Sequence, residues 1–400
     1  MVRYHLSKDI TDASLILLGF LFLSFICGMS FLSFFSSITS HEGQSGASTP
    51  AGYPDASRRR RDPEDDDGIE AATLPRLYRD QDGMLSFGNT IQCEVACGGR
   101  DPCEYQLAAD FRVIVLAYDE PEQLGNCLRS LEGIRMYGDA IVVDVWVDKL
   151  PGGRWNDAVL RTVSHFIGSW HLGYACVHVH DENVGSRSQW INSWRPQENV
   201  SQITLIVEDD VVLSPFVYKW LRNVWDNYVI REGFRLAGVS LNTNGLRRRT
   251  DKGTQLIRGP PGDSVYAYRA VAGGGAFAPN PVTWAAFQRW YGGLSLANRK
   301  LSIVVPGEPS TERRLQQTWQ SWYNYYCYKH GLFTLCPNLV AFSGLLNVSL
   351  AHHVGEEGGT GIRKGVDGSA FVLNEWIESY GNLPTELVYL DYTGLVLPTA

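Results

Sequence analysis

The sequence predicts an α/β protein with a doubly wound, mainly parallel sheet, preceded by a single transmembrane helix. Two observations support the sheet. Short β-branched apolar runs alternate with amphipathic helical segments between residues 111 and 207, and several of these runs end in acidic residues. One observation supports the membrane helix. Residues 13–40 contain no charged side chain, and about 20 apolar residues suffice to cross a bilayer.

The first expected element is the membrane helix at residues 13–38, which follows a cytoplasmic tail at residues 1–12. A cleaved signal peptide is the alternative, but its apolar region is shorter, about 7–15 residues. The tail carries as many acidic as basic residues, so the orientation has to be inferred from the rest of the chain. N-x-S sequons at Asn199 and Asn347 are compatible with a lumenal C-terminal domain.

Residues 39–105 are interpreted as a stem. Four arginines at 58–61 run directly into the acidic stretch 62–67, and such charge blocks cannot bury enough apolar surface to fold. The basic run is either a protease site or part of a solvated stem. Seven cysteines follow the membrane segment, and the first three lack CxxC spacing, so we expect disulfides rather than a zinc cluster. These seven residues are Cys93, Cys97, Cys103, Cys127, Cys176, Cys327 and Cys336.

The remaining residues, 106–400, are expected to form the folded lumenal domain. Its first segments alternate between short apolar runs rich in β-branched residues, which predict buried strands, and apolar residues at i, i+3, i+4 spacing, which predict helices. The net charge of −8 argues against nucleic acid as a partner, because a phosphate-binding surface should be basic. The predicted strands are 111–117, 140–147, 174–180 and 203–207, and the predicted helices are 122–131 and 158–170.

Acidic residues follow three of these strands: Asp119, Asp148 and the triplet Glu208-Asp209-Asp210. In open α/β sheets, ligands bind beyond the carboxyl ends of the strands. Carboxylates gathered there are costly unless a cation compensates them, and a hard divalent cation shared with substrate phosphates would do so. Such an ion would assist a diphosphate leaving group as a Lewis acid. The structural alternatives are that Asp148 only ends a strand and that Asp119 only starts a turn.

These motifs resemble a known family. The turn Tyr118-Asp119-x-Pro, the run Ile-Val-Glu-Asp-Asp-x-x-x-Ser-Pro at 206–215 and the glycine-rich segment 269–277 are similar to the GT-A fold of inverting glycosyltransferases. The similarity is greatest to the N-acetylglucosaminyltransferase I type and its family-2-like relatives, and it covers about residues 111–353. The resemblance implies a hexosyl- or N-acetylhexosaminyltransferase of the Golgi or endoplasmic reticulum membrane, single-pass and type II, with a lumenal catalytic domain.

The resemblance also implies roles for individual residues. Asp210 would bind Mn²⁺ or Mg²⁺, and Glu208 and Asp209 would contact ribose or water. Asp148 would accept a hydrogen bond from the base of a nucleotide-sugar, a UDP-sugar in particular, and the Tyr118-Asp119 turn would border that base. The second substrate would be a glycan or glycoconjugate acceptor.

The catalytic base departs from the family pattern. Inverting transfer needs a carboxylate to take the proton of the acceptor hydroxyl. Where the N-acetylglucosaminyltransferase I type has Trp-Asp-Asp-Trp, this chain has Trp-Gln-Ser-Trp at 319–322. Glu312 is the first substitute and Glu308 the second. The alternative is that Glu312 only begins a helix, where acidic residues are favoured.

His352 and His353 form the last candidate feature, together with Glu356 and Glu357. Adjacent residues of a strand point to opposite faces, so only one of the two histidines would enter a site. Some GT-A enzymes use a C-terminal histidine for the metal or the diphosphate, which makes His353 a candidate metal ligand. The alternative is a pair of surface histidines in a glycine-rich loop.

Two other functions remain open. A catalytically degenerate relative would act as a binding or scaffold component in polysaccharide synthesis, and the missing Trp-Asp-Asp-Trp acids favour it. A metal-dependent phosphotransferase or nucleotidyltransferase would share the carboxylate chemistry, but the chain has no GxxxxGK[ST] loop.

Overall fold

The computed structural model describes residues 77–79, 85–88, 109–196, 202–231, 235–243, 246–250, 253–295, 303–306, 318–339, 349–354 and 372–398. The chain divides into two compact units, Met1–Glu70 and Ala71–Ala400, and all described residues belong to the second. The predicted membrane helix, the sequon asparagines Asn199 and Asn347 and the basic run at 58–61 lie outside the described residues. Within the described part, no helix is long and apolar enough to cross a membrane.

Four parallel strands form the half of the main sheet that was expected from the sequence. Their spatial order is β5-β4-β3-β6, and each neighbouring pair is parallel. Each strand agrees with its predicted range to within one residue at either end. Because these strands are buried on both faces, their sequences are almost continuously apolar. The strands are β3 (Phe111–Ala117), β4 (Ile141–Val147), β5 (Gly173–Val179) and β6 (Ile203–Glu208).

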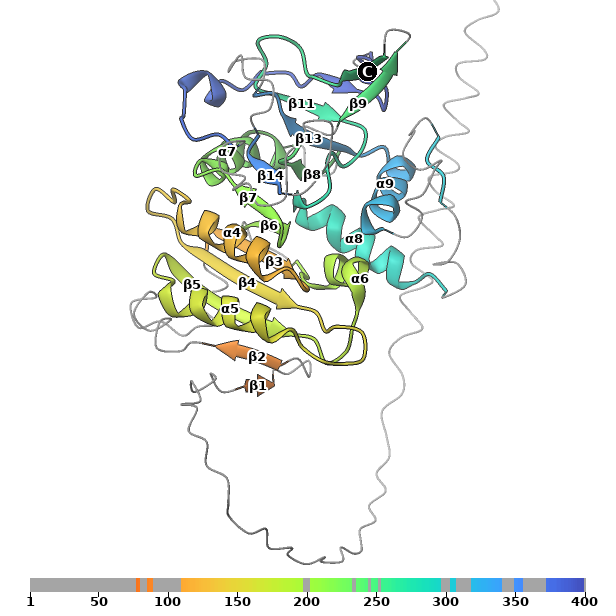
Figure 1. The fold of residues 1–400 in the computed structure, drawn as a ribbon. Helices are drawn as coiled ribbons and strands as arrows, with labels where there is room; N and C mark the ends of the chain where they lie inside the picture. Colours follow the sequence, from red (N-terminus) through yellow and green to blue (C-terminus); the bar gives the residue numbers. More distant parts are fainter. Residues whose placement is uncertain are drawn as a thin grey trace, which may run out of the picture. The chain divides into compact units, whose positions relative to one another are not determined.

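Helices cover both faces of this half-sheet (Figure 1). Helices α4 (Pro121–Glu132) and α5 (Asp157–Ser169) pack their apolar stripes on one face, in a core shared with the odd-numbered residues of β3. Helix α6 (Gly185–Asn192) packs on the other face against the even-numbered residues of β3. The structure therefore confirms an α/β sheet between two helical layers, as in doubly wound folds.

The other half of the main sheet is mixed. Strand β12 runs antiparallel to both β6 and β8, while β13 lies parallel to β8 and antiparallel to β11, which pairs in parallel with β15. The parallel arrangement expected from the sequence thus holds on one side of β6 and is interrupted on the other. The strands are β8 (Leu236–Ser240), β11 (Val265–Tyr268), β12 (Ala276–Pro279), β13 (Phe333–Pro337) and β15 (Tyr389–Leu390).

The helices of the C-terminal half build an aromatic core. Helices α8 (Pro281–Gly292) and α9 (Trp319–His330) pack together with α6 through Trp, Tyr and Phe side chains. Helix α9 begins at the Thr318 N-cap, whose side chain accepts from the Ser321 N–H. Stacking at helical spacing explains the aromatic richness of residues 319–326, so these side chains form core rather than an open binding surface.

The remaining elements are short. Strands β1 and β2 lie at the sheet edge, where β2 pairs antiparallel with β5, and both fall in the range 39–105 that the sequence analysis assigned to a stem. Strands β7 and β14 form a two-stranded sheet, as do β9 and β10. The elements are β1 (Leu77–Arg79), β2 (Leu85–Gly88), β7 (Val211–Leu213), α7 (Val217–Val224), a π-helix (Trp225–Val229), β9 (Arg247–Thr250), β10 (Gly253–Leu256), β14 (Ala351–His353) and a 3-10 helix (Glu378–Gly381).

The described cysteines are buried thiols and form no disulfides. They are Cys127, Cys176, Cys327 and Cys336. The expectation of disulfides is therefore not met at these four positions, all of which are buried. Cys93, Cys97 and Cys103 lie outside the described residues.

Candidate functional site

The acidic triplet lies at the carboxyl end of β6, between β3 and β12. Strand β6 ends at Glu208, and Asp209 and Asp210 form the turn that leads into β7. The Glu208 N–H donates to the Gly275 carbonyl at 2.8 Å, and the Asp209 N–H donates to the Leu116 carbonyl at 3.1 Å. Hydrogen bonds from both neighbouring strands therefore fix the backbone of the triplet.

His353 joins the triplet from a distant part of the sequence. Strand β14 pairs antiparallel with β7, so that His353 lies opposite Val211. The His353 Nδ1 atom is 3.0 Å from Asp210 Oδ2, and its Nε2 atom is 3.2 Å from Glu208 Oε2. One ligand atom from each of Glu208, Asp210 and His353 lies within 4.8 Å of the other two. Of the two adjacent histidines, position 353 thus faces the acids, as strand alternation requires.

The charges of this cluster compensate one another. Burial alone would lower the pKa of His353, but hydrogen bonds to Asp210 and Glu208 outweigh it and raise the pKa to about 10. Burial alone would raise the pKa of Glu208, but hydrogen bonds from His353 and from the Trp190 indole, at 2.8 Å, outweigh it and lower the pKa. At neutral pH His353 is therefore an imidazolium, within hydrogen-bond distance of both Glu208 and Asp210.

The donor set fits a hard divalent cation. Carboxylate oxygens and one imidazole nitrogen are ligands that Mn²⁺ accepts. The second oxygen of Asp210, Oδ1, is buried and has no hydrogen-bond partner among the described residues. A buried acceptor without a donor costs free energy, and a bound cation would satisfy it. Glu208, Asp210 and His353 are therefore the residues that could hold the metal.

Asp209 connects the triplet to the end of β3. Its Oδ2 atom accepts the Tyr118 N–H at 3.0 Å. Burial, together with the neighbouring charges of Asp210, Glu120 and Glu208, raises the pKa of Asp209 to about 7, although the Tyr118 N–H opposes this shift. Tyr118 is half-buried beside the triplet, whereas Asp119 is exposed and accepts through its carbonyl from the Asn156 amide. The structure therefore places Tyr118 at the site through its backbone.

Asp148 has a structural role that differs both from the expected contact with a nucleotide base and from the alternative, that it only ends a strand. It follows β4 and is 1% exposed. Its Oδ1 accepts from the N–H groups of Lys149 and Val184, both at 2.9 Å, and its Oδ2 accepts from the N–H of Gly185 at 2.7 Å. Because Gly185 begins α6, the Asp148 carboxylate anchors the N-terminus of that helix.

The candidate bases Glu312 and Glu308, and also Glu356 and Glu357, lie outside the described residues. The segment that replaces the Trp-Asp-Asp-Trp motif forms the first turn of α9, and that turn carries no acidic residue. Its Gln320 side chain donates to the Val271 carbonyl at 2.9 Å. The first turn of α9 therefore provides no carboxylate that could act as the catalytic base.

Two residues that contribute to the site, Trp190 and Gly275, were not predicted from the sequence. Trp190 of α6 donates to Glu208 and stacks on Trp319 with ring centres 4.0 Å apart, and no local motif signals this contact. Gly275 has φ +80°, and a Cβ there would lie 2.5 Å from the His353 ring. Gly275 belongs to the glycine-rich segment 269–277, which carries part of the resemblance to the GT-A fold. Its glycine character is the signal that a side chain approaches its backbone closely.

Comparisons with known proteins do not identify a family for this chain. No protein-family model matches the chain, and no curated protein sequence matches it. Among solved structures, it is similar to the crystal structure of the apo-form glycosyltransferase GlyE from Streptococcus pneumoniae TIGR4, at 12% sequence identity and a TM-score of 0.23. The matched region covers 45% of this chain and 36% of that one. A similarity of this size does not bear on function, which has to be argued from the site.

Proposed function

We propose that the chain is a metal-dependent glycosyltransferase that uses a nucleotide-sugar donor. One observation carries the proposal. Glu208 and Asp210 lie at the carboxyl end of a buried parallel strand. His353, which follows Glu208 by 145 residues in the sequence, lies beside them, and the three side chains form one set of possible metal ligands. The edge formed by the carboxyl ends of parallel strands is where α/β folds bind nucleotides.

Each residue then has a defined task. Asp210 and His353 would hold Mn²⁺ or Mg²⁺, with Glu208 as a third ligand or as the carboxylate that orients His353. The bound ion would neutralise the charge that develops on the diphosphate as the sugar leaves. Asp209, which holds the Tyr118 backbone, would fix the edge of the nucleotide pocket. Asp148 would position α6 beside that pocket, rather than contact the base directly.

The finer assignments belong to the same proposal. The donor is a UDP-sugar, the acceptor is a glycan or glycoconjugate, and the reaction inverts the anomeric carbon. Glu312, or else Glu308, takes the proton of the acceptor hydroxyl. The chain is anchored by residues 13–38 in the Golgi or endoplasmic reticulum membrane, with residues 106–400 in the lumen.

A catalytically degenerate binding protein is the second candidate. The first turn of α9 favours it, because Gln320 and Ser321 stand where the related enzymes place acids, and neither side chain is a competent base. Such a protein would keep metal-dependent nucleotide binding and lose transfer.

Release of UDP from a panel of UDP-sugars in the presence of Mn²⁺ separates these functions. We expect turnover with at least one donor, abolished by Asp210→Asn, which removes a charged ligand while keeping the side-chain shape. Asp226→Asn is the matched control, because Asp226 is a surface acid paired with Arg222. Metal-dependent UDP binding without turnover of any donor would instead support the binding protein.

A further inference from the structure

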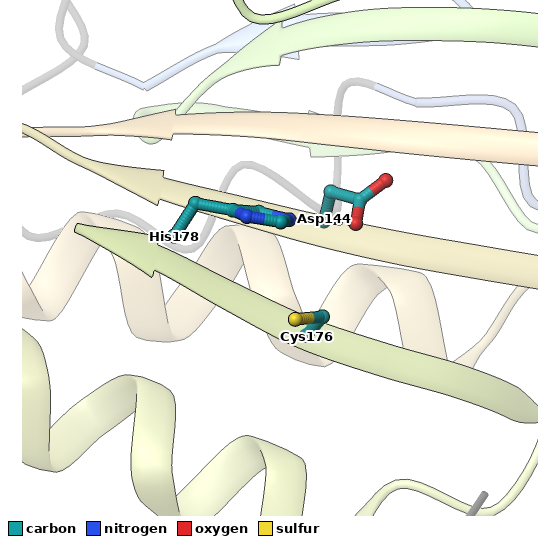
Figure 2. A group of neighbouring side chains, drawn as sticks. All are labelled: Asp144, Cys176 and His178. Atoms are coloured by element: carbon teal, nitrogen blue, oxygen red, sulfur yellow. Dashed lines mark hydrogen bonds and ion pairs between the residues drawn. The ribbon is translucent and has the colours of Figure 1, made fainter. Parts of the chain in front are cut away.

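A second group of metal-ligating side chains lies within the main sheet, away from the acidic triplet. Asp144 of β4 lies directly opposite Cys176 of β5, and His178 is two residues further along the same strand. Residues i and i+2 of a strand share a face, so all three side chains meet on one side of the sheet (Figure 2). One ligand atom from each lies within 4.8 Å of the other two.

Neighbouring side chains hold two of these residues in place. The Asp144 Oδ2 atom accepts from the Arg112 guanidinium at 2.5 Å, which leaves Oδ1 to face His178 Nε2 at 3.0 Å. Arg112 is itself fixed by the Gln202 side chain, which accepts from its Nε at 2.9 Å. The His178 ring stacks on Trp146, with centres 4.4 Å apart and planes inclined by 18°. Outer contacts of this kind orient the ligands in metal sites.

We propose that Asp144, Cys176 and His178 bind Zn²⁺. Thiolate, imidazole and carboxylate together form a ligand set typical of zinc, whereas thiolate is a poor ligand for Mn²⁺ or Mg²⁺. In a tetrahedral zinc site with bonds of about 2.0–2.2 Å, nitrogen and oxygen ligands lie roughly 3.3–3.6 Å apart. The 3.0 Å between Asp144 and His178 is slightly shorter, so a small side-chain movement opens room for the ion.

The ligands are buried but reachable. Asp144 is 2% and Cys176 is 4% exposed, whereas the His178 side chain is 16% exposed and forms the accessible side of the cluster. Because the ligands come from adjacent strands, the ion would cross-link β4 and β5. A zinc with three protein ligands also keeps a fourth position for water.

Cobalt substitution tests this proposal in the intact chain. After chelation, one equivalent of Co²⁺ should produce a thiolate-to-cobalt charge-transfer absorption that Zn²⁺ then removes. The band should disappear in Cys176→Ser and persist in Cys127→Ser, which replaces another buried cysteine. The proposal is overturned if the wild-type chain shows no such band, since the cluster is then a metal-free ion network.

A second variant tests whether cysteines outside the cluster supply the thiolate. The triple variant Cys93→Ser/Cys97→Ser/Cys103→Ser leaves the Asp144 cluster untouched and should keep the cobalt band. Loss of the band there, or its persistence in Cys176→Ser, would assign the thiolate elsewhere and overturn the proposal. The cobalt spectra are measured without any turnover of UDP-sugars. The zinc proposal and the proposed transferase activity are therefore tested independently, and either one can be contradicted without the other.

Discussion

At the residue scale, the candidate metal site depends on close contacts between side chains that are far apart in sequence. His353 lies between Glu208 and Asp210, and the backbone of Gly275 approaches the Cδ2 and Nε2 atoms of its ring. Trp190 fixes the remaining oxygen of Glu208. Each contact constrains one ligand atom, so small substitutions around the site should alter metal binding before they alter the fold.

Gly275→Ala should weaken Mn²⁺ binding and lower stability. Its Cβ would lie 2.5–2.6 Å from the His353 ring, and its φ of +80° is unfavourable for alanine, a strain of about 1–3 kcal/mol. Gly274→Ala is the matched control, because its Cβ would meet only Gln320, at 3.7 Å. Titration with Mn²⁺ and thermal unfolding measure both effects. Equal behaviour of the two variants would contradict the close packing of His353.

Trp190→Phe should reduce Mn²⁺ affinity while the core stays packed. The variant keeps an aromatic ring against Trp319 but loses the 2.8 Å hydrogen bond to Glu208. Loss of such an orienting partner costs about 10–100-fold in metal affinity. Trp284→Phe is the control, because the buried Trp284 indole N–H has no hydrogen-bond partner among the described residues. Calorimetric titration distinguishes them, and an unchanged affinity in Trp190→Phe would show that Glu208 needs no such support.

At the element scale, ionic contacts between side chains connect the adjacent strands β3, β4 and β5. Arg112 of β3 and His178 of β5 both contact Asp144 of the intervening strand. Burial alone would lower the pKa of His178, but hydrogen bonding to Asp144 and Cys176 outweighs it and raises the pKa to about 10. Removing one partner of a buried ion pair leaves the charge of the other uncompensated, which strongly destabilises the folded state.

This network predicts a pH dependence in the metal-free chain. Because the folded-state pKa of His178 is raised from 6.5 to about 10, its contribution is complete below pH 6.5 and is lost as the pH rises through about 10. With a chelator present, the difference in melting temperature between wild type and His178→Gln should therefore be largest below pH 6.5 and shrink towards pH 10. A difference that grows with pH would contradict the assigned protonation state.

At the scale of the whole molecule, the pairing of β14 with β7 brings residue 353 to the end of β6. The hydrogen bond from the Val354 N–H to the Asp210 carbonyl, at 2.7 Å, extends this connection. A cation bound to Asp210 and His353 would therefore link the first half of the main sheet to the C-terminal part of the chain. Metal binding and global stability should be coupled.

Mn²⁺ should raise the melting temperature of the chain. A ligand that binds only the folded state at a hundredfold excess over its Kd stabilises by about 2.7 kcal/mol. His353→Gln should abolish the shift, whereas His352→Gln should keep it, because the neighbouring position faces away from the acids. Differential scanning calorimetry measures the shift. Equal shifts in both variants would exclude His353 as a ligand.

The sequence alone predicted the local elements of the first half-sheet. Apolar runs and helical spacing between 111 and 207 placed four strands and two helices to within one residue, since strands buried on both faces leave a continuous apolar pattern. It also placed Glu208, Asp209 and Asp210 at a strand end, and strand alternation restricted the two histidines to one. Each of these features depends on residues that are close together in the sequence, so the sequence pattern alone is enough to predict it.

Only the tertiary structure decided which distant residues meet. The antiparallel insertion of β12, the contact of Trp190 with Glu208 and the close approach of Gly275 to His353 join segments without a shared motif. Asp144 lies inside an apolar strand, and its partners come from two other strands. Asp148 was expected to contact the base of the nucleotide, and the structure shows that its carboxylate anchors the start of α6 by two backbone hydrogen bonds, from Val184 and Gly185. Such contacts depend on strand order and register, which no local sequence pattern determines.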